Sequence, residues 1–263
     1  MFDEIPKTNQ HAYTYKCPYC KIVLKTKQNL IHHLTHSCPK KDSIEMHTKA
    51  TIRLKPYEFL MKLPVDDHEI IFVTGPPKCG KSYWINEYVK AYKQMFGRKV
   101  FLFTRNEHDD TLANDEDKYI KITISDDLDA DPLTLDDLRD SLIIMDDIES
   151  SEHKKGTQRA YNLLDDVCKN GRHYNINVIF ANQECRMGVK TKKILSMLTM
   201  LVIYPSSGET YQCERLLKEY AGRSKSEINL IMNLQSRWVA FSRPKPQYVM
   251  GEHDIYMIGK EIY

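Results

Sequence analysis

The segment GPPKCGKS, residues 75–82, constrains the fold of this chain more than any other feature. It has the spacing G-x-x-x-x-G-K-S. An apolar run, EIIFVT at 69–74, precedes it, and a stretch of helical character, 83–95, follows it. In this strand–loop–helix context, the backbone N–H groups of the loop and of the helix start converge on phosphate groups. The motif therefore predicts an α/β domain that binds a nucleotide.

The residues of this loop have separable roles. Lys81 is expected to reach the β- and γ-phosphates, and Ser82 to ligate Mg²⁺. Gly75 and Gly80 permit the unusual backbone angles of a loop wrapped around an anion. The complete predicted nucleotide-binding segment is Gly75, Pro76, Pro77, Lys78, Cys79, Gly80, Lys81, Ser82 and Tyr83.

Acidic residues end a second apolar run, in the segment SLIIMDDIE at 141–149. A carboxylate at such a strand end can hold the water shell of Mg²⁺, and a second one can orient the attacking water. We assign the first role to Asp146 and the second to Asp147, with Glu149 as the alternative water-orienting residue.

A third predicted strand, NVIFA at 177–181, ends at Asn182 and Gln183. An amide at this position can contact the γ-phosphate or the attacking water. Gln183 is therefore a further candidate catalytic residue.

The rest of the body alternates between strand and helix patterns. Further strands are predicted at 100–103, 119–124, 200–204 and 238–241, and helices at 155–169, 209–220 and 225–234. This alternation is typical of a mostly parallel sheet covered by helices on both faces.

The N-terminal segment has the spacing of a zinc site. Cys17, Cys20, His33 and Cys38 follow the pattern Cys-x2-Cys-x12-His-x4-Cys. A Cys-x2-Cys turn and a following helix can supply four ligands to one Zn²⁺, and the pattern is similar to the two-Cys, two-His ββα fingers. His36 and His32 are alternative third ligands. Because so small a unit cannot bury much apolar surface, the metal would supply most of its stability.

Charge divides the chain in the same place as the motifs. The net charge is +2, but residues 1–55 carry 10 Lys/Arg against 4 Asp/Glu, which leaves 28 against 32 in the remainder. A basic head suggests an anionic partner. We predict a zinc finger with basic flanks at 1–40, a linker at 41–55 and a nucleotide-binding domain at 56–263. The longest apolar stretch, 197–204, is too short to span a bilayer, and an intracellular protein is expected.

Three segments together carry a family resemblance: GPPKCGKS, LIIMDDIES and CKNGRHYNINVIFANQ. The body, residues 65–245, resembles the viral genome-packaging ATPases of the FtsK/HerA superfamily of P-loop NTPases. The resemblance implies a homo-oligomeric ring that uses ATP and Mg²⁺ to pump double-stranded DNA into a capsid, with a capsid or vertex protein as partner. It also implies a location in the host cytoplasm, in a viral factory or on the virion.

The resemblance also implies roles for individual residues. Lys81 and Ser82 would bind ATP·Mg²⁺, Asp146 would hold the metal, Asp147 would polarise water and Gln183 would act as the sensor. Arg172 is the candidate for an arginine finger donated to the neighbouring subunit, with Arg186 as its rival. The superfamily often has Asp-Glu where this chain has Asp-Asp, so either Asp147 reaches the water or Glu149 serves.

Two other functions compete with a packaging motor. A P-loop small-molecule kinase usually places its acidic strand directly beside the strand of the phosphate loop. A non-enzymatic nucleic-acid adaptor would use the finger and carry a degenerate nucleotide site, which the intact Lys81, Ser82, Asp146 and Asp147 oppose.

Overall fold

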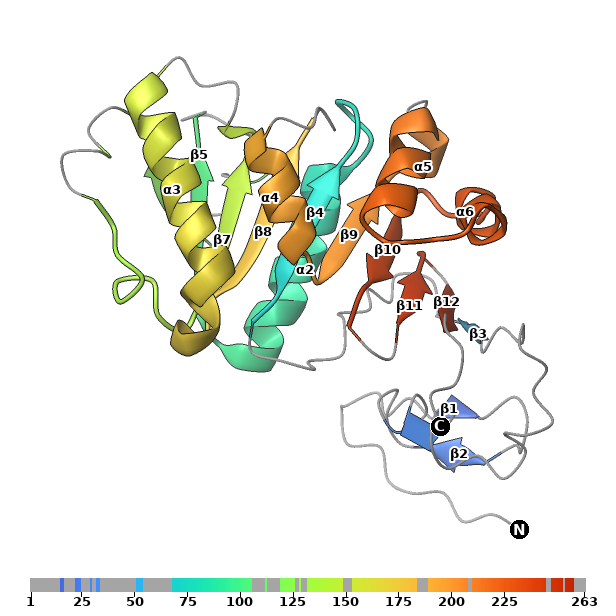
Figure 1. Cartoon of the computed structure of the whole chain (residues 1–263). Helices are drawn as coiled ribbons and strands as arrows, with labels where there is room; N and C mark the ends of the chain where they lie inside the picture. Colours follow the sequence, from blue (N-terminus) through green and yellow to red (C-terminus); the bar gives the residue numbers. More distant parts are fainter. Residues whose placement is uncertain are drawn as a thin grey trace, which may run out of the picture.

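The computed structural model describes residues 15–16, 22–24, 29, 32–33, 51–53, 68–105, 112, 119–125, 128, 132–148, 153–183, 189–207, 210–244, 247–252 and 254–257. A ten-stranded sheet runs through the body in the order β3-β12-β11-β10-β9-β4-β8-β7-β5-β6 (Figure 1). None of the helices in these ranges is long and apolar enough to cross a membrane.

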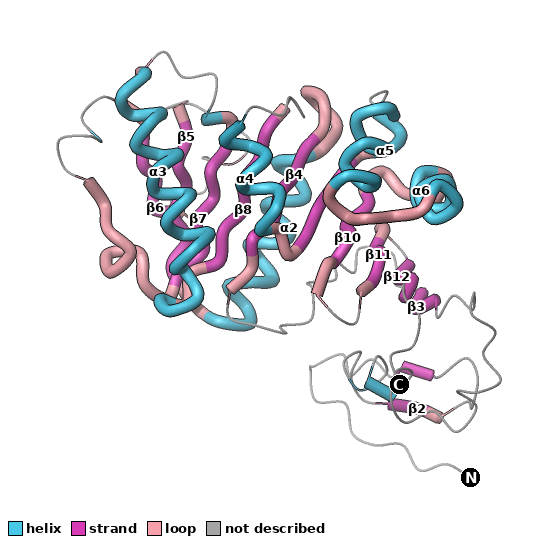
Figure 2. Tube along the Cα trace, in the orientation of Figure 1, coloured by secondary structure: helices cyan, strands magenta, loops and turns pink. Residues whose placement is uncertain are grey.

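The sheet, whose strands are magenta in Figure 2, has a parallel part and an antiparallel part. The parallel strands are β9 (Met200–Ile203), β4 (Ile70–Thr74), β8 (Asn177–Asn182), β7 (Ser141–Asp146), β5 (Lys99–Thr104) and β6 (Ile120–Thr123). The antiparallel extension beyond β9 consists of β10 (Val239–Ser242), β11 (Tyr248–Met250), β12 (Asp254–Met257) and β3 (Thr51–Arg53). The predicted mostly parallel α/β fold is confirmed.

Helices cover both faces of the sheet, as predicted. They are α2 (Lys81–Phe96), α3 (Lys154–Asn170), α4 (Val189–Met197), α5 (Thr210–Glu219) and α6 (Lys225–Met232), with the short 3-10 helices η5 (Gly171–Tyr174) and η6 (Pro205–Ser207). In Figure 1, α2 lies behind the sheet, whereas α3, α4 and α5 lie in front of it.

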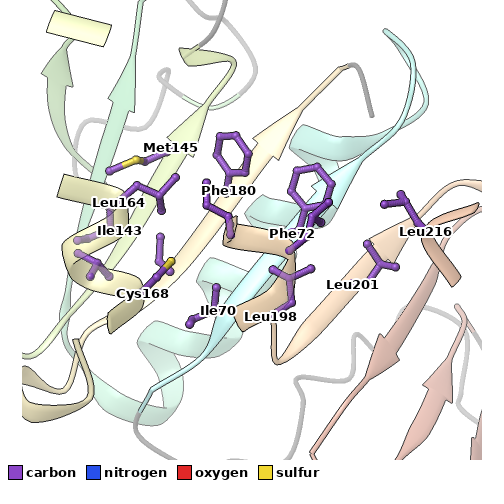
Figure 3. Close-up of a cluster of buried hydrophobic side chains, with 14 of the residues drawn as sticks. Ile70, Phe72, Ile143, Met145, Leu164, Cys168, Phe180, Leu198, Leu201 and Leu216 are labelled. Carbon is purple, nitrogen blue, oxygen red and sulfur yellow. The ribbon is translucent and has the colours of Figure 1, made fainter. Parts of the chain in front are cut away.

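Alternate side chains along each strand pack into two hydrophobic cores, one on each face of the sheet. Ile70 and Phe72 of β4 pack in the core beneath α3, α4 and α5, and Ile71 and Val73 pack in the core beneath α2. Figure 3 shows part of the first core, where Phe72 lies near Phe180 of β8 with ring centroids 5.4 Å apart. Because central strands are buried on both faces, they read as continuous apolar runs in the sequence.

A glycine sets how closely α3 can approach the segment that follows β6. A Cβ atom at Gly156 would lie 2.1 Å from the carbonyl oxygen of Ser125, so only glycine permits this contact. Glycine usually weakens a helix interior by about 1 kcal/mol, and here the close approach of the two backbones explains its presence.

Several elements were not predicted. The strands β11 and β12, the helix α4 and the strand β3 have no counterpart in the sequence expectations. Thr51–Arg53 forms β3, which pairs with β12, although it lies in the predicted linker 41–55. The main sheet therefore includes residues that precede position 56.

The predicted zinc finger falls mostly outside the described residues. Tyr15–Lys16 (β1) and Val23–Leu24 (β2) pair as a short antiparallel ladder, and His33 is buried whereas His32 is exposed. Three of the four predicted ligands lie outside the described ranges: Cys17, Cys20 and Cys38. Within those ranges no group of three metal-binding side chains comes together, so the zinc site stays a prediction.

Candidate nucleotide-binding site

The candidate site lies where three parallel strands end. In the register of the sheet, Thr74 of β4 is opposite Asn182 of β8, and Asp146 of β7 is opposite Ala181 of β8. The loop after β4, the acids after β7 and the amide after β8 therefore meet at one edge of the sheet (Figure 1). The carboxyl edge at a point between strands is where open α/β sheets bind their ligands.

The phosphate loop has the predicted strand–loop–helix form. Gly80 caps α2 with a φ of 112°, and Lys78 has a φ of 64°, so two of its residues adopt left-handed or similar conformations. The ammonium of Lys81 donates hydrogen bonds to the carbonyl oxygens of Gly75, at 2.6 Å, and Pro76, at 3.0 Å. Lys81 thus turns back over the loop, which places its charge where a bound phosphate chain needs it.

Tyr204, which follows β9, packs beneath the phosphate loop. A Cβ atom at Gly75 would lie 2.9 Å from Tyr204 Cδ2 and 2.8 Å from Cys79 Sγ, so no larger residue fits at position 75. The Tyr204 side chain is 1% exposed, and this burial raises the pKa of its hydroxyl well above the usual range. Tyr204 therefore stays neutral and acts as a rigid floor for the loop.

The remaining loop residues are more accessible. Pro77 and Lys78 are exposed, Cys79 and Ser82 are half-buried, and the Tyr83 side chain is 57% exposed at the start of α2. Cys79 packs against the edge of the core beneath α2, whereas Pro77, Lys78 and Tyr83 point toward the surface, so we expect the loop to bind phosphate mainly through its backbone, Lys81 and Ser82.

Asp147 has a strained backbone at the end of β7. Its φ of 53° is uncommon for a residue other than glycine, and its N–H donates to Ala181 O at 3.1 Å. Its carboxylate accepts a hydrogen bond from the amide of Gln183, which follows β8. Strain of this kind tends to occur where a side chain must be aimed at a ligand. The two residues predicted to handle the attacking water are therefore brought together.

The residues present fit a nucleotide with Mg²⁺. The Ser82 hydroxyl and the half-buried Asp146 carboxylate are hard oxygen ligands of the type that Mg²⁺ prefers. The loop adds the Lys81 ammonium and two glycines without side-chain bulk. These residues could hold the phosphates and the ion on the same edge of the sheet.

The candidate arginine finger lies away from this edge. Arg172 is exposed in η5, immediately before β8 begins, whereas the site lies at the other end of that strand. A six-residue strand spans about 20 Å, so Arg172 does not serve the site of its own chain. Arg186 and the alternative acid Glu149 lie outside the described residues.

Sequence reasoning missed two residues beside the loop, Tyr204 and Arg237. The Cδ atom of Arg237 lies 3.6 Å from the position that a Cβ atom at Gly80 would occupy. Arg237 precedes β10, and no motif marks it, because its approach to the loop depends on the antiparallel pairing of β10 with β9.

The fold and the phosphate loop together define a P-loop NTPase. No family model matches the chain. The chain is 30% identical, over 188 residues, to the uncharacterized protein V3 of the Sputnik virophage, a match that covers 70% of this chain and 75% of that protein. At this identity and coverage, the chain belongs to the same family as the virophage protein.

Solved structures with a similar fold include a viral genome packaging NTPase. The genome packaging NTPase B204 from Sulfolobus turreted icosahedral virus 2, in complex with sulfate, superposes with a TM-score of 0.51 at 15% identity. The match covers 74% of this chain and 99% of B204. The complex of B204 with AMPPCP gives a TM-score of 0.49 at 12% identity, over 73% and 98% of the two chains. At these identities the likeness concerns the fold.

Proposed function

We propose that this protein is an ATP-hydrolysing motor that translocates double-stranded DNA into a viral capsid. The observation that carries the proposal is the contact between Gln183 and Asp147 on the edge that also presents Lys81. A phosphate-binding loop alone would suit any nucleotide-binding protein. A carboxylate held beside it by an amide is the arrangement that hydrolysis needs.

Each residue has a part in the proposed hydrolysis. Lys81 binds the β- and γ-phosphates, and Ser82 and Asp146 hold Mg²⁺, which neutralises charge on the phosphates when bound. Asp147 orients the attacking water and accepts its proton, while Gln183 fixes the carboxylate of Asp147 and reaches toward the γ-phosphate. Turnover thus depends on residues at the ends of β7 and β8, which act on a nucleotide held by the loop after β4.

The order of the strands supports hydrolysis over small-molecule phosphorylation. The strand β8 lies between the loop strand β4 and the acidic strand β7. Small-molecule kinases of the P-loop class usually place these two strands side by side, without an intervening strand. The inserted β8 brings Gln183 between the loop and Asp147, where a sensor of the γ-phosphate belongs.

The parts of the proposal that concern DNA, a ring and a capsid rest on the family relationship to the virophage protein and on the fold shared with B204. The fold is shared with B204, a genome packaging NTPase, and the family includes a virophage protein. We infer a homo-oligomeric ring in which Arg172 reaches the neighbouring subunit, and a location in the host cytoplasm, viral factory or virion. The basic head, with Zn²⁺ on Cys17, Cys20, His33 and Cys38, would bind DNA or a capsid vertex protein.

ATP hydrolysis by the purified full-length protein, with and without long double-stranded DNA, tests this function. Turnover should rise several-fold with DNA, and Lys81→Ala should abolish it. Lys90→Ala, which removes an exposed lysine of the same helix paired with Glu87, serves as the control and should leave turnover unchanged. Hydrolysis that is indifferent to DNA would contradict a packaging motor and direct attention to small phosphoacceptors. No hydrolysis under any condition would contradict an ATPase.

A further inference from the structure

A polar pocket lies beside the phosphate loop, on the antiparallel side of the sheet. Its volume is about 290 Å³, and its walls come from Ser206 of η6, the segment 232–237 that begins at the last residue of α6, and Glu252 after β11. Since β10 runs antiparallel to β9, and β11 antiparallel to β10, the end of β9, the start of β10 and the end of β11 share one edge. That edge also carries the phosphate loop, because β9 is parallel to β4.

Arg237 joins this pocket to the loop. Its side chain lines the pocket and approaches Gly80, with the Cδ atom 3.6 Å from where a Cβ at that glycine would lie. Gly80 is the residue before Lys81, so this arginine flanks the loop opposite the Asp147 side, on the side of β9. The pocket and the loop are therefore parts of one continuous surface.

The guanidinium of Arg237 makes no hydrogen bond or ion pair with any of the described residues; only its backbone N–H does, to Glu252 Oε2 at 3.0 Å. Two arginines of the neighbouring helical segment, Arg215 and Arg223, are by contrast paired with Glu219 and Glu227. A guanidinium that lies beside a phosphate loop and forms no ion pair is suited to bind an anionic ligand.

The backbone that carries Arg237 is fixed by its neighbours. The Ser236 hydroxyl donates to Trp238 O at 2.6 Å and accepts from the N–H of Glu252 at 2.9 Å. A Cβ atom at Gly251 would lie 2.9 Å from Ser236 Oγ, so glycine lets the two loops meet. The position of Arg237 is thus set before a ligand binds, which lowers the entropy cost of binding.

Tyr204 adds a second polar group at the junction. Its buried hydroxyl has no hydrogen-bond partner among the described residues, and it lies close enough to Arg237 and Glu252 for their charges to act on its pKa. Tyr204 does not line the pocket itself; it packs beneath the loop at the point where Arg237 approaches Gly80.

We propose that this pocket receives the nucleoside part of the nucleotide whose phosphates lie in the loop, and that Arg237 binds the phosphate chain of that same nucleotide. The inference rests on the proposed nucleotide site and adds to it a nucleoside subsite. The volume of about 290 Å³ lies just below the range for whole small-ligand pockets, about 300–1,000 Å³, as expected for a subsite that receives only part of a nucleotide.

The lining supplies the chemistry for a base and a ribose. Exposed amides at Asn233 and Gln235 can each donate and accept hydrogen bonds along the edge of a base. The amide of Asn233 donates to Asn229 O at 2.7 Å, which leaves its oxygen as an acceptor. The carboxylate of Glu252 can accept from a ribose hydroxyl. Arg237 thus lies between the part of the surface that offers hydrogen bonds to a nucleoside and the loop that binds phosphate.

Equilibrium binding of two probes, Mg·ADP and inorganic tripolyphosphate, to the full-length protein tests the subsite. Tripolyphosphate presents a phosphate chain without a nucleoside, so comparison of the probes separates the loop from the pocket. Gln235→Ala should weaken Mg·ADP several-fold and leave tripolyphosphate unchanged. Arg237→Ala should weaken both, by about tenfold, which is typical for loss of one hydrogen bond to a charged group. Arg215→Ala, which removes an arginine of α5 that is paired with Glu219, should alter neither.

The outcomes separate this inference from the proposed function. If Arg237→Ala and Gln235→Ala bind Mg·ADP as the unmodified protein does, while Lys81→Ala does not, the nucleoside lies elsewhere and the inference is wrong. If the unmodified protein binds neither probe, both the loop assignment and the subsite fail. If it binds Mg·ADP with the expected dependence on Arg237 and Gln235 but hydrolyses no ATP, the subsite stands and the motor fails.

Discussion

The amide of Gln183 donates a hydrogen bond to the carboxylate of Asp147, and this contact joins the ends of two adjacent strands. The two side chains come from segments far apart in the sequence, and the parallel pairing of β7 with β8 sets their approach. Asp147 also holds a positive φ and donates its N–H to Ala181 O, so the same strand end fixes both its backbone and its side chain. We expect this pair to act as a unit in hydrolysis.

Asp147→Asn should remove the proton acceptor and retain the shape of the site. We expect kcat for ATP hydrolysis to fall by about 10²–10⁴-fold, because general bases typically contribute that much. Affinity for Mg·ADP should change little, since the phosphate loop is untouched. Asp166→Asn, at an exposed acid on α3, is the matched control and should keep full turnover. An unimpaired kcat in Asp147→Asn would move the water-orienting role to another acid, with Glu149 the next to substitute.

Gln183→Ala should also slow hydrolysis, and its effect should not add to that of Asp147→Asn. Residues in contact commonly show coupling energies of about 0.5–3 kcal/mol in a double-mutant cycle. We therefore expect the double variant to be nearly as active as Asp147→Asn alone. Single-turnover hydrolysis rates of the four proteins provide the measurement. Effects that simply add would mean that Gln183 acts on the γ-phosphate independently of Asp147.

Gly75→Ala should disable the loop without unfolding the domain. The added methyl group would lie within 3 Å of Cys79 Sγ and Tyr204 Cδ2, and Tyr204 is too tightly packed to yield. We expect Mg·ADP affinity to fall at least about tenfold, with overpacking that costs about 1–3 kcal/mol. Gly97→Ala is a useful comparison. A Cβ atom at position 97 would contact nothing, so nucleotide binding should be retained. The positive φ of 62° should nevertheless cost some stability, because residues other than glycine rarely adopt it. Normal binding by Gly75→Ala would show that Tyr204 can move.

A small ion-pair cluster predicts how stability depends on pH. Burial opposes the ionisation of Asp165, but hydrogen bonds from Lys169, at 2.5 Å, and Lys193, at 3.0 Å, outweigh it and lower the pKa of this carboxyl. Because the folded pKa lies below the unfolded value of about 3.9, the contribution is present above that value and is lost as pH falls through the folded pKa. The pairs are largely exposed, so the contribution should be below about 1 kcal/mol.

Urea unfolding of the unmodified protein and of Asp165→Asn checks this expectation. The difference in their free energies of unfolding should be constant from about pH 7 to pH 5 and should shrink below about pH 4. Lys193→Met removes the partner on α4 and should produce a similar loss near neutral pH. A difference that grows toward low pH would contradict the sign of the pKa shift.

The parallel part of the fold and the residues at its edge could be predicted because the apolar pattern of each strand there agrees with its buried place in the sheet. The strands β4, β7 and β8 are buried on both faces, so each reads as a continuous apolar run that ends in a polar residue. The carboxyl ends of parallel neighbours meet at one edge, which is why Lys81 and Asp147 could be assigned to one site from the sequence.

The antiparallel side could not be predicted in the same way. The strands β3, β11 and β12 have three or four residues each, and sequences as short as TIR or DIYM carry no period. Their pairing is set by the strands already in place. The proximity of Arg237 and Tyr204 to the loop depends on this pairing, so no motif could reveal it.

Arg172 provides a test of whether hydrolysis is shared between subunits. It is exposed in η5, at the opposite end of β8 from Gln183, so its guanidinium can reach a phosphate only in a neighbouring copy. Arg172→Ala should therefore leave the Mg·ADP affinity of the isolated subunit unchanged and lower turnover of the assembly by about 10³-fold or more, as expected for loss of an arginine finger.

Mixing two inactive variants makes this expectation specific. Lys81→Ala retains the donor arginine but lacks a working loop, whereas Arg172→Ala retains the loop but lacks the donor. If the finger acts between subunits, a mixed assembly contains some interfaces with an intact loop facing an intact arginine, and hydrolysis should return to a measurable fraction of the unmodified rate. Arg159→Ala, which removes another arginine of the preceding helix α3, is the control and should keep turnover without mixing. Failure of the mixture to recover, with assembly verified by light scattering, would mean that Arg172 does not complete the neighbouring site, and Arg186 would be the next residue to test in the same scheme.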